Sequence, residues 1–316
     1  MRLLVTGGAG FIGHHLVGRL LEEGHAVTVL DARSGSAVSR HAAAVYVEGD
    51  VRHRSLVAEV VRHQEGVFHL AAVVGVPNAM RHQWDSLTIT AQGTVHVLEA
   101  ARSANAPVFL ASSSAIYGKS RTGPLGEERD VHLGNTHRPA WTYSYAKLTE
   151  ELLGRAAAVE WGVRVVVGRL FNVIGPYQSA AYGAVVPRFV EQALVGAPLE
   201  VYGDGTQTRT FGDVRDVVRG ILTVWGKGAS GQVYNIGGVG ETRILDLART
   251  VVSLAGSQSE IRMVPFEQAF DKRFEETRRR VPSLKRLYAL GYRPQHTLSD
   301  SLQHIIAHHR ANRPRP

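Results

Sequence analysis

The sequence predicts an α/β fold in which a doubly wound parallel sheet is followed by a smaller C-terminal α/β lobe. Three observations predict this fold. Short apolar runs alternate with helical stretches from Leu3 to Leu170, a glycine-rich segment follows the first run, and the alternation ends after Asn172. The strands of a parallel sheet are buried on both faces, so they are continuous apolar runs joined by helices.

The elements follow one another in the order that such a sheet requires. Phe11, Ile12, Leu16 and Leu20 have helical spacing, and the run that ends at Leu170 is rich in β-branched residues. The expected strands are 3–6, 26–30, 45–47, 67–70, 108–111 and 163–170, and the expected helices are 11–21, 84–102 and 143–161.

The region beyond residue 174 is expected to form the second lobe. Residues 175–179 predict a loop, 186–195 and 244–254 predict helices, and 232–236 predict a strand. We therefore assign residues 1–174 to the first domain and residues 175–316 to the lobe. The segment of about 211–238 is expected to return to the first domain.

Composition narrows the class of protein. The 316 residues are 44% hydrophobic, which is enough for a large core. The chain has no cysteine, which excludes disulfides, thiol catalysis and cysteine-ligated zinc, and we expect no metal site. The first apolar run begins at Leu3, which leaves no room for a secretory signal, and no run approaches the roughly 20 residues of a membrane helix. We therefore expect a cytoplasmic protein with no membrane partner.

The formal net charge is +8, which favours polyanionic partners. The arginines are scattered, with small clusters at 278–280 and near the C-terminus. Nucleic acid requires a continuous basic stripe, whereas a nucleotide diphosphate requires only a few local cations. We therefore expect a nucleotide diphosphate as the anionic partner and no nucleic acid.

Three glycines, Gly7, Gly10 and Gly13, lie between the first expected strand and the first expected helix. The first allows a tight turn, the second lets the backbone approach a pyrophosphate, and the third lets the helix pack closely on the strand. The helix N-terminus then offers its N–H groups to the phosphates. This context predicts a Rossmann-like dinucleotide-binding site in the first domain.

Asp31 stands at the end of the second expected strand, near the offset of about 20 residues at which a carboxylate binds a ribose 2′-hydroxyl. A carboxylate there repels the 2′-phosphate of NADP, so we predict NAD as the cofactor. Arg33 leaves NADP open, because an arginine there can meet a 2′-phosphate. The other interpretation of Asp31 is a simple turn cap.

Tyr143 and Lys147 are four residues apart on an expected helix and share one face. A phenol has a pKa near about 10 and is a poor base at neutral pH, but a nearby ammonium favours the phenolate. The serine run Ser112-Ser113-Ser114 lies just past the strand that ends at Ala111, where the ligand crevice of a doubly wound sheet opens. These residues predict a general base with a hydroxyl beside the reacting oxygen.

Together these segments resemble the extended short-chain dehydrogenase/reductase family, in its nucleotide-sugar epimerase/dehydratase branch. The resemblance covers nearly the whole chain. The matching segments are TGGAGFIG at 6–13, HLAA at 69–72, SSSAIYG at 112–118, Tyr143 with Lys147, FNVIGP at 171–176, VYGDGTQTRTF at 201–211 and VYNIGG at 233–238. Thr90 and Ser283 depart from it, because family members usually carry asparagine and aspartate at these positions.

The resemblance implies a role for each matching residue. Tyr143 is implied to be the base, Lys147 to hold the nicotinamide ribose, and Ser113 to supply the catalytic hydroxyl. The residues implied to contact the cofactor are Gly7, Gly10, Phe11, Ile12, Gly13, Asp31, Asp50, Val51, Leu70, Ala71, Ala72, Tyr143 and Lys147. Those implied to contact the substrate are Ser113, Ser114, Asn172, Val186, Tyr202, Arg209 and, for the second arginine on the diphosphate, Arg273 or Arg278.

The serine segment indicates the reaction. Family dehydratases resemble a Thr-Asp-Glu pattern there, and decarboxylating members place a glutamate in the segment, whereas this chain has Ser113-Ser114-Ala115. Epimerisation needs no acid or base beyond the tyrosine, so we predict an NAD-dependent nucleotide-sugar 4-epimerase. No lysine or arginine lies between Arg169 and Arg188, which favours a neutral sugar, and the resemblance favours a uridine nucleotide.

Two kinds of alternative stay open. One is a nucleotide-sugar dehydrogenase, reductase, dehydratase or decarboxylase of the same family. The other is a non-enzyme that senses a dinucleotide or binds RNA, although such a protein does not need Ser113, Tyr143 and Lys147 together. Helices 84–102 and 143–161 resemble the pair that forms a dimeric four-helix bundle in family members, so we expect a homodimer.

Overall fold

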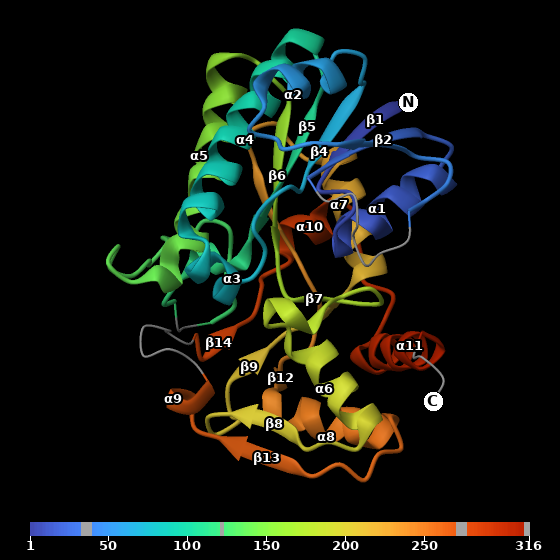
Figure 1. The fold of residues 1–316 in the computed structure, drawn as a ribbon. Helices are drawn as coiled ribbons and strands as arrows, with labels where there is room; N and C mark the ends of the chain where they lie inside the picture. Colours follow the sequence, from blue (N-terminus) through green and yellow to red (C-terminus); the bar gives the residue numbers. More distant parts are fainter. Residues whose placement is uncertain (33–39, 121–122, 270–276, 313–316) are drawn as a thin grey trace.

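The computed structural model describes residues 1–32, 40–120, 123–269 and 277–312. A large sheet lies in the upper part of the molecule, with a smaller lobe below it (Figure 1). Seven strands form the large sheet in the order β11-β6-β5-β4-β1-β2-β3, and every neighbouring pair is parallel. These strands are β1 (Arg2–Thr6), β2 (Ala26–Asp31), β3 (Val45–Glu48), β4 (Gly66–His69), β5 (Val108–Ser113), β6 (Val165–Leu170) and β11 (Val233–Ile236). The predicted doubly wound parallel sheet is confirmed.

Helices cover both faces of this sheet because alternate strand residues point to opposite sides. Leu4 packs in one buried cluster, whereas Leu3 and Val5 pack in the other. The helices of the first side are α2 (Arg54–Val61), α4 (Gln83–Ala104) and α5 (Thr142–Glu160). Those of the second side are α1 (Phe11–Glu22), α7 (Val214–Lys227) and α10 (Lys285–Ala289). The short α3 (Val76–Arg81) lies near the start of α5.

The smaller lobe has its own apolar cluster, to which three helices contribute. They are α6 (Val185–Val195), α8 (Ile244–Leu254) and α11 (Leu298–Ala311). Strand β8 (Leu199–Tyr202) pairs in parallel with β13 (Ile261–Val264), and α9 (Phe266–Ala269) follows. A second, three-stranded sheet contains β9 (Thr208–Arg209), β12 (Thr242–Arg243) and β14 (Arg279–Arg280).

A two-stranded pair of β7 (Val173–Ile174) and β10 (Gly212–Asp213) lies where the chain leaves the large sheet and returns to it. Such two-residue strands are too short to show a hydrophobic period, so the sequence does not predict them. Three 3₁₀ turns complete the described elements: η1 (Ser114–Tyr117), η2 (Pro139–Trp141) and η3 (Ala180–Tyr182).

In the part of the chain that the structure describes, no helix is long and apolar enough to cross a membrane.

The chain after Pro198 passes between the two parts more than once. Strand β11 pairs with β6 in the large sheet, and α7 packs against β6 and α1. Leu287 of α10 and Tyr292 also pack in the core beneath the large sheet, a placement that the sequence analysis did not predict. The carboxyl ends of the parallel strands therefore face several separate segments of the lobe (Figure 1).

Candidate active site

The glycine-rich segment lies at the carboxyl end of β1, beside the end of β4. Gly7 has a φ of 70°, and a Cβ added to it would lie 2.8 Å from the backbone nitrogen of Ala71. A Cβ on Gly13 would lie 2.3 Å from the carbonyl oxygen of Gly7. Both positions therefore require glycine, and the helix α1 begins directly after Gly10.

The order of strands reverses at this place, because β2 follows β1 on one side and β4 adjoins it on the other. Open parallel sheets bind their ligands in the crevice at such a switch point. Leu70 donates its N–H to the carbonyl of Thr6 at 3.0 Å, which holds residues 70–72 against the glycine turn. The structure thus brings the first two predicted cofactor segments together.

The acidic residues of the predicted cofactor site lie at the ends of β2 and β3. The carboxylate of Asp31 accepts a hydrogen bond from the N–H of Ala9 at 3.1 Å, so it also orders the glycine turn. The guanidinium of Arg52 binds the carboxylate of Asp50 at 2.6 Å, and this contact lowers the pKa of Asp50. Val51 is buried beside Gly93 of α4. Arg33, on which the choice between NAD and NADP partly depended, lies outside the described residues.

The predicted catalytic residues come from β5 and the first turns of α5. Ser113 ends β5, and its Oγ accepts the N–H of Ala115 at 3.1 Å. Ser144 donates its hydroxyl proton to the carbonyl of Ala115 at 3.0 Å, which holds the start of α5 against the serine turn. Tyr143 is partly exposed, and its hydroxyl makes no hydrogen bond to any residue that the structure describes.

Lys147 lies one turn further along α5 and is 2% exposed. Its ammonium interacts electrostatically with Tyr143 and donates a hydrogen bond to Glu150 at 2.6 Å. The structure therefore brings Tyr143 and Lys147 together as predicted from their spacing. Glu150 is a buried member of this group that the sequence analysis did not single out.

A buried polar network supports the floor of the site behind the serine turn. Ser112 donates a hydrogen bond to Glu151, and Glu151 binds the guanidinium of Arg169 at 2.8 and 2.9 Å. Arg169 also donates to the hydroxyl of Tyr117 at 2.9 Å, and that hydroxyl donates to Asn235 at 2.8 Å. The network joins β5, α5, β6 and β11, so it fixes the positions of the strand and helix that carry Ser113 and Tyr143.

Two arginines meet on the side of the lobe that faces the sheet. Arg209 of β9 and Arg280 of β14 are direct partners in a parallel pair of strands, so their side chains share one face. Burial, and then the neighbouring Arg209, lower the pKa of Arg280 to about 9. Within the described residues Arg280 forms no ion pair with a carboxylate, and it interacts electrostatically with Tyr143. Two like charges held together in this way attract an anion.

Arg280 was not among the predicted substrate residues. Arg273, one of the two candidates, lies outside the described residues, and Arg278, the other, is exposed and interacts with Asp204. Arg279 is bound to Glu241 at 2.7 Å. The signal for Arg280 was its place in a run of three arginines, but only the strand pairing shows which one faces Arg209.

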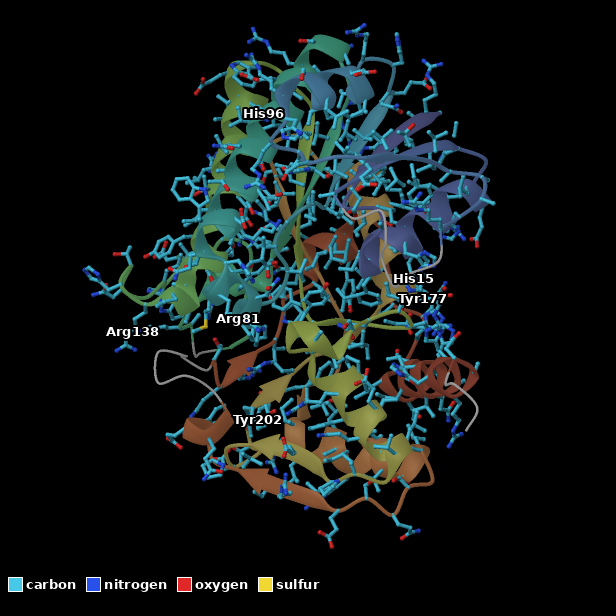
Figure 2. All side chains as sticks on the ribbon, viewed as in Figure 1. His15, Arg81, His96, Arg138, Tyr177 and Tyr202 are labelled. Carbon is cyan, nitrogen blue, oxygen red and sulfur yellow. The ribbon has the colours of Figure 1, made fainter. Side chains whose placement is uncertain are left out.

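The remaining predicted substrate residues are more dispersed. The amide of Asn172, which has a φ of 27°, donates to the carbonyl of Thr210 at 2.9 Å, so it links β7 to the segment of Arg209. Ser114 and Val186 are buried. Tyr202 lies in the smaller lobe (Figure 2), where the guanidinium of Arg188 stacks on its ring at 3.9 Å.

His69, at the end of β4, is fully buried beneath the site. Its Nδ1 lies 2.7 Å from the hydroxyl of Thr6, and burial, with a smaller effect of Lys147, lowers its pKa to about 3. An unfolded histidine has a pKa near about 6.5, so the folded state lacks a proton that the unfolded state binds below that pH. The stability that neutral His69 provides is present above about pH 6.5 and is lost as the pH falls towards 3.

We therefore expect His69→Asn, which keeps an acceptor near the Thr6 hydroxyl, to reduce the acid sensitivity of the fold. Between about pH 7 and pH 5 the wild type should lose about 2 kcal/mol more of its unfolding free energy than the variant. Urea unfolding at the two pH values measures this difference. His63→Asn, at an exposed position, is the control and should leave the loss unchanged.

Comparisons with known proteins agree with this geometry. The NAD dependent epimerase/dehydratase family matches residues 3–237. The chain is 36% identical to a UDP-N-acetyl-alpha-D-glucosaminuronate decarboxylase of Bacillus cytotoxicus over 90% of both chains. The structure of a UDP-glucose 4-epimerase from Thermotoga maritima, solved with UDP-glucose, matches with a TM-score of 0.90, 29% identity and coverage of 98% of this chain and 99% of that one.

A third relative carries a different activity. A dTDP-glucose 4,6-dehydratase from Streptomyces venezuelae, solved with NAD bound, matches with a TM-score of 0.87 and 30% identity over 99% of this chain and 98% of that chain. The relatives thus include proteins named as a decarboxylase, an epimerase and a dehydratase. The resemblance that the sequence motifs indicated is confirmed, and the chain belongs to the NAD-dependent epimerase/dehydratase family.

Proposed function

We propose that this protein is an NAD-dependent nucleotide-sugar 4-epimerase. The observation that carries the proposal is the identity of the residue after the serine pair. Ala115 is 4% exposed, and its backbone binds both Ser113 and Ser144, so it occupies the turn beside the base without an acidic side chain. In the described part of the chain, Tyr143 interacts electrostatically with two cations, Lys147 and Arg280. The absence of an acidic side chain at position 115 suits epimerisation, which needs only the tyrosine base. It suits elimination of water less well, because that reaction needs further acids.

The mechanism follows from the positions of these side chains. Tyr143 accepts the proton of the sugar C4 hydroxyl, and the hydroxyl of Ser113 hydrogen-bonds the same oxygen. NAD, which the glycine turn and Lys147 would hold, would supply the acceptor and then the donor of the hydride at C4. After the sugar has turned over in the pocket, Tyr143 returns the proton to the oxygen on the other face. The ammonium of Lys147 interacts electrostatically with this base.

The two ends of the substrate must be held differently. Arg209 and Arg280 would bind the diphosphate, because charge-assisted contacts to phosphate are strong and geometrically specific. The sugar must rotate, so its contacts should be few. The hydrogen bond of Asn172 to Thr210 would hold the segment of Arg209 in a fixed position relative to β7.

The test is a product analysis with the purified protein and NAD. Uridine and thymidine diphosphate hexoses, N-acetylhexosamines and uronates are supplied separately, and products are identified by chromatography and proton NMR. A C4 epimer that forms without net NADH supports the proposal. A keto, dehydrated or decarboxylated product that accumulates instead contradicts it.

A uronate decarboxylase is the second candidate, and Arg280 is the observation that favours it. A cation that interacts with the base also suits a sugar carboxylate, and a relative at 36% identity is named as a decarboxylase of a uronate. The same analysis separates the two candidates. Decarboxylation releases carbon dioxide and leaves a sugar one carbon shorter, whereas epimerisation conserves every carbon.

We also propose that the chain is a homodimer, formed through α4 and α5. Large apolar side chains on this helix pair are exposed, with Trp84 at 77%, Leu152 at 61% and Val159 at 76%. Exposed apolar side chains on one pair of helices are the kind of surface that an interface with a second copy would bury. Sedimentation velocity should show a dimer, and Leu152→Glu should shift it towards the monomer. A monomer in the wild type at micromolar concentration contradicts the proposal.

A further inference from the structure

Lys147 and Glu150 form an ion pair inside α5 that is almost wholly removed from water. The side chain of Lys147 is 3% exposed and that of Glu150 is not exposed, and the Nζ–Oε2 distance is 2.6 Å. The second carboxylate oxygen of Glu150 is buried and has no hydrogen-bond partner among the described residues. Every side-chain hydrogen bond of Glu150 in that part of the chain therefore goes to Lys147.

Other titratable groups of the described residues also lie near the pair. Glu151, the next residue on α5, is bound to Arg169 of β6. His69, at the end of β4, is neutral above about pH 3 because it is buried. Tyr143 of α5 interacts electrostatically with Lys147, and Arg280 of β14 interacts electrostatically with Tyr143. Glu150 is thus the counter-ion of Lys147.

We propose that Glu150 is a positioning residue whose carboxylate keeps Lys147 charged and holds its ammonium where a dinucleotide ribose and Tyr143 both use it. Glu150 itself would touch neither cofactor nor substrate. The inference rests on the proposed function in one respect, because it takes Lys147 as the residue that holds the ribose.

The chemistry of a buried lysine explains why a counter-ion is needed. Burial favours the neutral amine, and a lysine in an apolar interior can lose its charge near neutral pH. Here burial lowers the pKa of Lys147, but Glu150 opposes it most strongly, and the net pKa is raised. Burial raises the pKa of Glu150 to about 7, so its carboxylate is charged at alkaline pH. An ammonium has three donors, and one bond to Glu150 leaves two for the ribose and the base.

NAD binding tests this inference without any turnover. Isothermal titration calorimetry measures the NAD affinity of the wild type and of Glu150→Gln from about pH 8 to about pH 9.5. The amide keeps the shape but not the charge, so the pKa of Lys147 should be lower in the variant than in the wild type. We expect the affinity of the variant to fall about tenfold more than that of the wild type, as for a lost charge-assisted hydrogen bond.

Two further variants separate charge from position. Glu160→Gln removes an exposed carboxylate at the end of the same helix and should follow the wild type at every pH. Glu150→Asp keeps the charge but withdraws it by about one methylene. We expect weaker NAD binding at every pH and no added pH dependence, and this variant tests the positioning if Glu150→Gln does not fold.

The inference is overturned if Glu150→Gln has the pH dependence of the wild type. It is also overturned if Glu150→Asp binds NAD as the wild type does, or loses affinity with pH as the glutamine variant does. A failure of the proposed function is a separate result. In that case no nucleotide sugar is epimerised, while NAD binding still responds to Glu150 as described.

Discussion

Replacing Tyr143 by phenylalanine is expected to lower turnover by about 10²–10⁴-fold, the usual effect of removing a general base. The phenol oxygen is the only atom lost, and it makes no hydrogen bond to the described residues, so folding should be unaffected. NAD affinity should stay close to that of the wild type. Steady-state rates on the substrate identified by product analysis, together with NAD titration, measure both effects.

Tyr145→Phe is the matched control for this prediction. Tyr145 lies on the same helix, but its hydroxyl donates to the carbonyl of Gly134 at 2.9 Å. Its loss should cost about 1 kcal/mol of stability and little activity. If Tyr143→Phe retained more than about a tenth of the wild-type rate, another group would have to be the base, and the mechanism above would be wrong.

Replacing Glu151 by glutamine is expected to destabilise the fold by about 3–5 kcal/mol, because Arg169 is left as a buried charge without a counter-ion. The side chains of both residues are less than a tenth exposed, and their contact is bidentate. Thermal and urea unfolding of the two proteins measures the loss. The relative positions of Ser113 and Tyr143 should also become less fixed, since the network joins the strand of Ser113 to the helix of Tyr143.

A double variant tests the stated cause of this loss. If the uncompensated charge of Arg169 destabilises the fold, Glu151→Gln combined with Arg169→Met should be more stable than Glu151→Gln alone. Glu160→Gln, on the exposed end of the same helix, should change stability by no more than about 0.5 kcal/mol. A double variant that is less stable than the single one would attribute the loss to the lost hydrogen bonds instead.

The sequence predicted most of the large sheet because its strands are buried on both faces and separated by long helices. It did not predict the two-residue strands β9 and β14, whose pairing decides which arginine accompanies Arg209. The absence of basic residues between Arg169 and Arg188 favoured a neutral sugar, yet Arg280 approaches Tyr143 from a distant segment. A search within one stretch of sequence cannot find a side chain that a different strand supplies.

By itself, the sequence determined the parallel sheet, the glycine turn at its switch point, the serine turn after β5 and the shared helix face of Tyr143 and Lys147. These features depend on local periods and short spacings, which are visible along one chain. Only the tertiary structure decided that Arg280 stands beside Arg209 and that Glu150 is the buried counter-ion of Lys147. Whether a charged side chain is solvated, paired or aimed at a ligand depends on burial and on neighbours from distant segments.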